Sequence, residues 1–127
     1  MASNAGEFKA LPSVAFSSYI YPSKSLRMLY LTQLIYLKKG QEAVFDEFEA
    51  VAIPLIAKYS GSLLFRLRPN AEDFIETQIE CPYEIHFVSF PAEADFMAFM
   101  RDEERKKFLH LKEQSIRESW LVKGERL

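Results

Sequence analysis

The sequence has 127 residues, of which 49% are hydrophobic and 27% are charged, and its formal net charge at pH 7 is −2. This length and this balance are typical of one folded domain and exclude general disorder. The slightly acidic composition provides no positive field for a phosphate backbone, so we expect no nucleic acid partner.

The sequence shows no sign of export or membrane insertion. No segment reaches the roughly 18 apolar residues of a membrane span, and residues 1–9 lack the basic start and apolar run of a signal peptide. Cys81 is the only cysteine, which excludes an internal disulfide framework and fits a reducing compartment. We therefore expect a cytoplasmic protein without a membrane partner.

The chain divides into an N-terminal extension, residues 1–26, and a folded domain, residues 27–127. The extension mixes small and hydroxyl residues with short apolar patches. It is either a loose terminus or an arm that places Phe16, Tyr19 and Tyr21 on the domain or on a partner subunit.

The domain begins with a strand followed by a helix. Residues 27–37 are apolar and rich in strand formers, which predicts a central strand covered on both faces. Apolar residues then recur every three or four positions from residue 41 to residue 59, which predicts an amphipathic helix. We assign Glu49 to its polar face and expect Gly61 to end it in a left-handed conformation.

The remaining segments complete two similar units. The predicted elements are a strand at 63–68, a hairpin connection at 70–81, a strand at 82–91, a helix after Pro91, a helix beginning near 102 and a short strand at 120–122. This order predicts an α+β fold of the ferredoxin-like type, with a four-stranded antiparallel sheet and helices on one face. Because both sheet faces carry apolar residues, we expect a homodimer formed through the sheet faces.

Three runs of residues, 59–66, 85–94 and 102–109, resemble the dimeric α+β barrel superfamily. The most similar family within it is the uncharacterised one called domain of unknown function thirteen-thirty. The resemblance covers about residues 27–124 and omits the extension.

The chain departs from that family's pattern at several positions. Ser60 replaces a Gly, Ser89 stands where the family usually has Glu, and Ala92 removes a capping Ser. The resemblance implies the fold and a dimer, whereas members of the family have no agreed activity. More distant relatives include cofactor-independent monooxygenases, haem-degrading enzymes and small-molecule isomerases, and such analogy supports only a general functional expectation.

Glu84 and His86 are the candidate catalytic pair. They share one face of a strand and lie about 7 Å apart along it, so a direct hydrogen bond between them is not expected. Arg66 on a neighbouring strand could reach them. In the functional interpretation His86 is a general base, Glu84 orients it and Arg66 stabilises an enolate; in the structural one, His86 bonds across the dimer interface and Glu84 pairs with an arginine.

Other candidate sites are weaker. His110 would be the natural axial ligand of a haem between sheet and helices, although a lone helical histidine is more often exposed. Cys81 has no neighbouring cation and is interpreted as structural. No cofactor and no metal site is predicted, because the spacing of His and Cys residues matches no metal motif.

Two functions remain open. The first is an assembly or ligand-binding module; the second is a cofactor-independent monooxygenase or isomerase that acts on a small aromatic or polyketide-like compound. Either would bind a small apolar or aromatic ligand between sheet and helices, with two or three of the many aromatic residues lining the pocket and the rest in the core.

Overall fold

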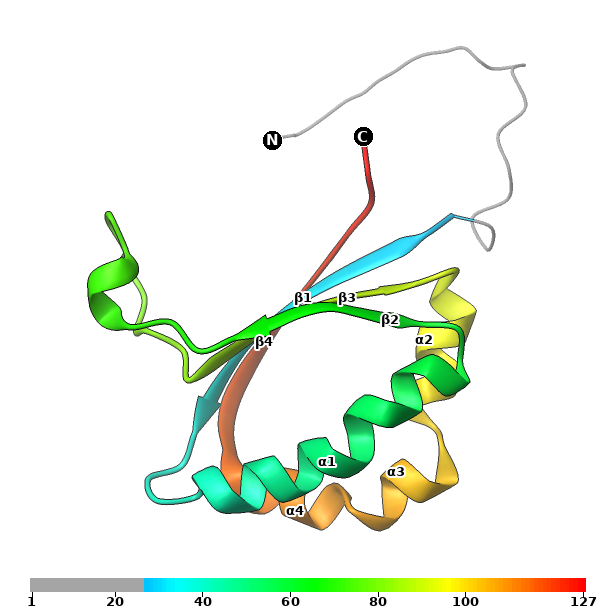
Figure 1. Cartoon of the computed structure of the whole chain (residues 1–127), viewed down its shortest axis with the longest axis horizontal. Coiled ribbons are helices and arrows are strands. Elements are labelled where there is room, and N and C mark those ends of the chain that lie inside the picture. Colours follow the sequence, from blue (N-terminus) through cyan, green and yellow to red (C-terminus); the bar gives the residue numbers. More distant parts are fainter. Residues whose placement is uncertain (1–26) are drawn as a thin grey trace.

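A computed structural model describes residues 27–127, so the predicted arm at residues 1–26 lies outside the described part of the chain. The fold is α+β and ferredoxin-like, with one antiparallel sheet and its helices packed on a single face (Figure 1). The elements are β1 (Leu29–Leu37), α1 (Glu42–Lys58), β2 (Ser62–Leu67), a short 3-10 helix (Ala71–Asp73), β3 (Glu84–Phe90), α2 (Glu93–Met100), α3 (Glu103–Lys107), α4 (Leu109–Ser115) and β4 (Ile116–Gly124).

The sheet has the strand order β2-β3-β1-β4, so each β-α-β unit places its two strands on either side of a strand from the other unit. β1 is central and pairs with β3 on one side and with β4 on the other. The predicted order of strands and helices is therefore confirmed.

The last strand differs from its prediction. We expected it at 120–122, whereas β4 begins at Ile116 and pairs with nearly the whole of β1. The local pattern of residues 116–119 is compatible with a continuing helix as well as with a strand. Hydrogen bonds to the central strand decide for the strand. The pairing of β4 with β1 shifts register between Tyr36 and Leu37, which is typical of a β-bulge or a similar irregularity.

The junction between α1 and β2 also corrects a prediction. Ser60, and not Gly61, has the left-handed conformation, with φ 63°. Gly61 instead allows a close approach, because a Cβ atom at that position would lie 2.6 Å from Phe90 Cε1 and 2.7 Å from Ile56 Cγ2. The glycine therefore lets the start of β2 pack against the main core, while the serine makes the turn.

The core lies between the sheet and the helices. The larger cluster joins both layers through Leu31, Ile56, Val88, Phe90, Phe96 and Phe99. A second cluster holds α4 against α1 through Phe48, Ala52 and Leu111. No helix within residues 27–127 is long and apolar enough to cross a membrane.

The other face of the sheet carries no helix (Figure 1). Side chains of Tyr30, Phe65 and Phe87 form one row across it, with ring centroids 5.9 Å and 5.5 Å from the ring of Phe87. Trp120 and Val122 on β4 are about half exposed. We call the surface formed by these five residues the open face.

Candidate functional site

The candidate pair lies on the sheet face that the helices cover. Glu84 and His86 are 1% and 4% exposed, and they alternate with Ile85 and Phe87, which lie on the opposite face of β3. The pair therefore lies inside the molecule, and the structural interpretation that placed His86 at a contact between two sheets does not match its position.

Glu84 is held by two arginines, Arg66 of β2 and Arg68 one residue after the end of β2. Arg66 donates to both carboxylate oxygens, at 3.0 Å and 3.1 Å, and Arg68 donates to Oε1 at 2.8 Å. Burial of the Glu84 carboxyl raises its pKa, but hydrogen bonds from His86, Arg68 and Arg66 outweigh this effect and lower the pKa to about 2. Glu84 is thus a fixed, ionised acceptor.

His86 Nε2 contacts Glu84 Oε2 directly, contrary to the sequence expectation. The expectation used the spacing of the backbone, whereas side chains in a strand lean along it and the Glu side chain is long enough to reach its neighbour but one. In the tautomer that donates its Nε2 proton to the ionised Glu84 carboxylate, Nδ1 is the unprotonated ring nitrogen. Nδ1 is then the ring nitrogen that can act as a base.

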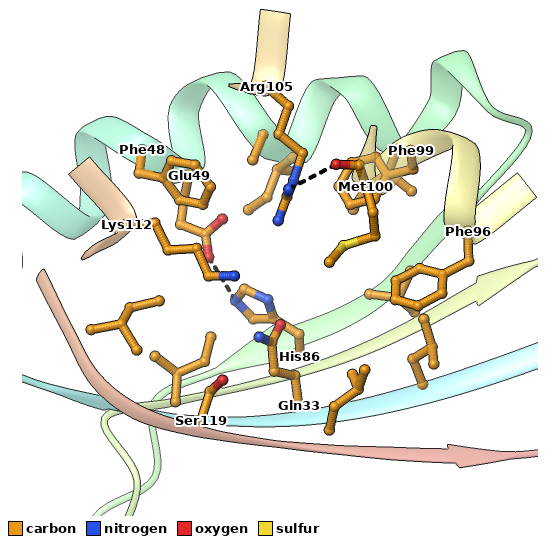
Figure 2. Close-up of a pocket in the computed structure, with 18 of the residues that line it drawn as sticks. Gln33, Phe48, Glu49, His86, Phe96, Phe99, Met100, Arg105, Lys112 and Ser119 are labelled. Carbon is orange, nitrogen blue, oxygen red and sulfur yellow. Dashed lines mark hydrogen bonds and ion pairs between the residues drawn. The ribbon is translucent and has the colours of Figure 1, made fainter. Parts of the chain in front are cut away.

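A second carboxylate, that of Glu49, lies near the same ring. Its Oε2 is 3.7 Å from His86 Nε2 (Figure 2). The assignment of Glu49 to the polar face of α1 was wrong, because the side chain is 7% exposed among buried Phe45, Phe48 and Ala52. Burial raises the pKa of Glu49, and the neighbouring His86 opposes that effect.

His86 and Glu49 face a cavity of about 170 Å³ between the sheet and the helices. Apolar side chains from every layer form most of its wall, and Phe48, Phe96 and Phe99 give it aromatic surface (Figure 2). Aromatic residues do line a pocket, as expected, but Phe90 makes them four, and Phe65 is 44% exposed on the open face and not in the core. An apolar cavity of about 150 Å³ admits benzene, so this one has the volume for a single-ring compound.

Two cations point into the cavity from the helical side (Figure 2). Arg105 of α3 is 6% exposed and contacts the rings of Phe48 and Phe99, with its guanidinium carbon 5.7 Å and 5.1 Å from their centroids. Lys112 of α4 is half-buried. Burial lowers the pKa of both Arg105 and Lys112 below their ordinary values.

A cap positions Arg105 in the wall. Asp102 Oδ1 accepts a hydrogen bond from the backbone N–H of Arg105 at 3.0 Å, which begins α3. Asp102 Oδ2 accepts further hydrogen bonds from Lys58 at 2.7 Å and from the Tyr59 hydroxyl at 2.6 Å, and so joins α3 to the end of α1. The first of these contacts, from Lys58, contributes most to holding the pKa of Asp102 well below its ordinary value.

Glu49, Glu84 and His86 are also the one group among residues 27–127 whose ligand atoms come close enough for a metal ion, all within 4.8 Å of one another. The sequence spacing did not predict this set, because Glu49 comes from another element. Glu84 already accepts hydrogen bonds from two arginines, which satisfies its charge. This arrangement favours proton transfer through His86 over coordination of a cation.

The other sequence candidates lie elsewhere. His110 is exposed and does not line the cavity, so it does not lie between the sheet and the helices, where a haem ligand was expected. Arg66 binds Glu84 and is not part of the cavity wall, which removes the geometric basis for its predicted contact with an enolate. Cys81 is half-buried, with Sγ 3.6 Å from the carbonyl oxygens of Pro69 and Pro82.

Sequence reasoning missed Glu49, Arg105 and Lys112. Glu49 follows the buried Phe45 by four residues and precedes Ala52 by three, which is the spacing of the apolar stripe, so a signal existed. Arg105 belongs to the charge run at residues 102–107, whose paired signs predict a solvated helix face, and Lys112 was not singled out. Nothing local to the sequence distinguishes them from exposed Lys106 and Lys107.

No protein-family model matches the sequence, and no curated protein matches it. Solved structures do match the fold. A protein of unknown function from Rhodopseudomonas palustris superposes with a TM-score of 0.70 at 14% identity, covering 80% of this chain and 84% of that one.

Two further structures have the same architecture. A dimeric protein of unknown function with a ferredoxin-like fold from Bacteroides fragilis has a TM-score of 0.56 at 14% identity, covering 78% of this chain and 96% of its own. A dabb family protein with a ferredoxin-like fold from Mesorhizobium loti has a TM-score of 0.55 at 13% identity, covering 80% and 98%. At these identities the likeness shows the fold alone, and the fold of this chain is ferredoxin-like.

Proposed function

We propose that this protein binds a small, single-ring compound in the cavity between sheet and helices and abstracts a proton from it, as an isomerase does. The observation that carries the proposal is the position of His86, a buried imidazole in the wall of an apolar cavity, backed by an ionised carboxylate. A neutral histidine whose second nitrogen is fixed by a carboxylate is a suitable general base near neutral pH.

The roles follow from the contacts. His86 is the catalytic residue, because it alone of the predicted trio lines the cavity. Glu84 is a positioning residue that fixes the tautomer and orientation of the ring, and Arg66 and Arg68 hold Glu84. In the reaction Nδ1 of His86 takes a proton from a carbon next to a carbonyl group, and the electron pair of the broken C–H bond moves to the carbonyl oxygen as an enolate forms. Return of a proton from the imidazolium to carbon completes the exchange.

The test measures exchange of the benzylic hydrogens of phenylacetone for deuterium in D₂O by proton NMR. We expect the protein to accelerate exchange and His86→Gln to reduce the acceleration by at least about a hundredfold, since a positioned general base contributes roughly 10²–10⁴-fold. His110→Gln is the matched control, because His110 is exposed and outside the cavity, and it should leave the rate unchanged. Equal loss in both variants, or no acceleration by the wild-type protein, would contradict the proposal.

A control with and without metal ions tests whether His86 acts as a base or as a ligand of a metal centre. Exchange is measured in EDTA and again after addition of Mn²⁺ or Zn²⁺. Because Glu84 is already satisfied by arginines, we expect the rate in EDTA to equal the rate without it. A rate that vanishes in EDTA and returns with metal would assign Glu49, Glu84 and His86 to a metal centre and would overturn the role of His86 as a free base.

We also infer that the protein is a homodimer of the dimeric α+β barrel superfamily, in which the open face binds a second copy. Phe65, Trp120 and Val122 are each 44% to 55% exposed on this face, and an apolar surface of this kind marks an interaction site. One solved structure with the same fold is described as dimeric, which supports this occupant. Membership of the more specific uncharacterised family stays a prediction.

A further inference from the structure

We propose that Arg105 and Lys112 form a subsite for the carboxylate of the ligand, so that the compound bound beside His86 is a single-ring carboxylate such as an aromatic 2-oxo acid. This inference rests on the proposed function and adds the chemical class of its substrate. The charged end would lie on the helical wall, and the ring would lie among Phe48, Phe96 and Phe99.

Arg105 lacks the partners that a buried guanidinium requires. Among residues 27–127, its buried Nε has no hydrogen-bond partner, and its one side-chain hydrogen bond, from Nη1 to the Met100 carbonyl oxygen, is long at 3.4 Å. A guanidinium has five N–H donors. Burial of a charge without a partner costs roughly several kcal/mol of desolvation free energy. In Figure 2 the group points from α3 into the cavity. No acidic oxygen of residues 27–127 forms an ion pair with it, although Glu49 and Asp102 act on its charge from a greater distance. An anion supplied by a ligand would satisfy it.

Lys112 adds a second positive charge to the same space. Its ammonium group points toward His86 from α4 (Figure 2), and no acidic oxygen among residues 27–127 lies within the 4.0 Å of an ion pair. After burial, Arg105 lowers the pKa of Lys112 further, whereas Glu49 and Glu113 oppose this shift, and the pKa of Lys112 stays below its ordinary value.

The remaining charges of the site do not neutralise this pair. Glu84 is satisfied by Arg66 and Arg68. Glu49 is the one acid among the residues that line the cavity, and burial raises its pKa while His86 and Arg105 oppose that effect. The wall therefore has an excess of positive charge in an apolar space, which is the arrangement that selects an anion with an apolar body. A planar carboxylate matches the forked donors of Arg105.

The experiment compares phenylpyruvate with phenylacetone, which carry the same ring and the same acidic methylene group but differ in the carboxylate. Hydrogen–deuterium exchange of both compounds is measured with wild-type protein, Arg105→Met, Lys112→Met and Arg105→Lys. We expect KM for phenylpyruvate to rise by about tenfold or more in Arg105→Met and by less in Lys112→Met, because one lost charged hydrogen bond weakens binding by about that factor. Arg105→Lys should restore part of the loss.

Three comparisons make the result specific. The loss should be smaller for phenylacetone than for phenylpyruvate in all three variants, since phenylacetone has no carboxylate to bind, so the ratio of the two KM values is the readout. Lys107→Met removes the same charge from an exposed position of α3 and should alter neither compound. Far-UV circular dichroism checks that each variant is folded, and if Arg105→Met does not fold, Lys112→Met decides.

The outcomes separate this inference from the function on which it rests. If phenylacetone exchanges in a His86-dependent manner but phenylpyruvate has no lower KM and neither Met variant affects it, the anion subsite is refuted and the proton-transfer proposal stands. If phenylpyruvate binds in an Arg105-dependent manner but shows no His86-dependent exchange, the subsite stands as part of a binding pocket and the catalytic proposal is refuted.

Discussion

At the scale of single residues, two buried glutamates near one histidine differ in pKa because their partners differ. Glu84 accepts hydrogen bonds from two arginines and a histidine. Among the described residues, His86 is the one basic side chain with a nitrogen within 4.0 Å of the Glu49 carboxylate. The pKa of Glu84 is therefore low and that of Glu49 is raised. The two carboxylates should contribute to stability with opposite dependence on pH.

The first prediction concerns Glu84→Gln. Because the pKa of Glu84 falls from 4.5 to about 2 on folding, its contribution to stability is present above pH 4.5 and is lost as the pH falls toward 2. The variant should lower the free energy of unfolding at neutral pH by up to roughly 3 kcal/mol and flatten its acid dependence. Urea unfolding of wild type and variant between about pH 3 and pH 7 measures both effects.

Glu49→Gln is the matched opposite case. A carboxyl with a raised pKa binds its proton more tightly in the folded state, so the stability that it contributes at low pH is lost as the pH rises. We expect this variant to raise the free energy of unfolding at pH 7 and to have less effect in acid. Destabilisation by both substitutions at neutral pH would show that the assigned charge states are incorrect.

The residues of the site could be predicted only where strand geometry determined them. Alternation along residues 84–90 placed Glu84 and His86 on one face, and an arginine partner for Glu84 was expected. Which face this was depended on where the helices pack, and Arg105 and Lys112 reach the cavity through contacts across the whole fold. Their local sequence is that of an ordinary exposed helix, so periodicity could not reveal them.

At the scale of elements, the order of strands and helices followed from apolar patterning, but their ends did not. The β4 strand is longer than predicted because pairing with β1 recruits residues 116–119, whose local composition favours no single state. The junction of α1 and β2 was located correctly, although the roles of its two small residues were exchanged. Tertiary contact with Phe90, which no local pattern contains, decides the requirement for Gly61.

A pair of substitutions tests that junction. Gly61→Ala should lower the free energy of unfolding by about 1–3 kcal/mol, because a Cβ atom 2.6 Å from Phe90 must displace the core ring. Ser60→Gly should raise it by up to about 1 kcal/mol, since glycine adopts a φ of 63° without steric cost. Thermal and urea unfolding measure both, and a stabilising Gly61→Ala would refute the close-packing explanation.

At the scale of the whole molecule, the two faces of the sheet have different roles. The helices cover one face of the sheet (Figure 1) and enclose the cavity with it. The open face presents aromatic and aliphatic side chains to the outside. A second copy packed there would cover this surface without blocking the cavity, because the two lie on opposite sides of one sheet. Assembly and ligand binding should therefore be separable by mutation.

Phe65→Glu tests this separation. It places a charge beside Phe87 at the centre of the aromatic row and should convert a dimer, of about twice the 14.8 kDa of the chain, to a monomer at micromolar concentration. Light scattering measures the mass. Ile75→Glu is the control, because Ile75 is fully exposed in the connection between β2 and β3, and it should leave the dimer intact. A wild-type monomer would refute the proposed interface.

The most direct test of the central claim uses the two histidines as reporter and control. The chain contains only His86 and His110, the first in the cavity wall and the second exposed, so ¹⁵N-imidazole NMR resolves them as separate signals. Titration with phenylacetone and with phenylpyruvate should shift the His86 resonances in a saturable manner and leave those of His110 in place. Unchanged His86 resonances, or equal shifts in both rings, would contradict a ligand site beside His86.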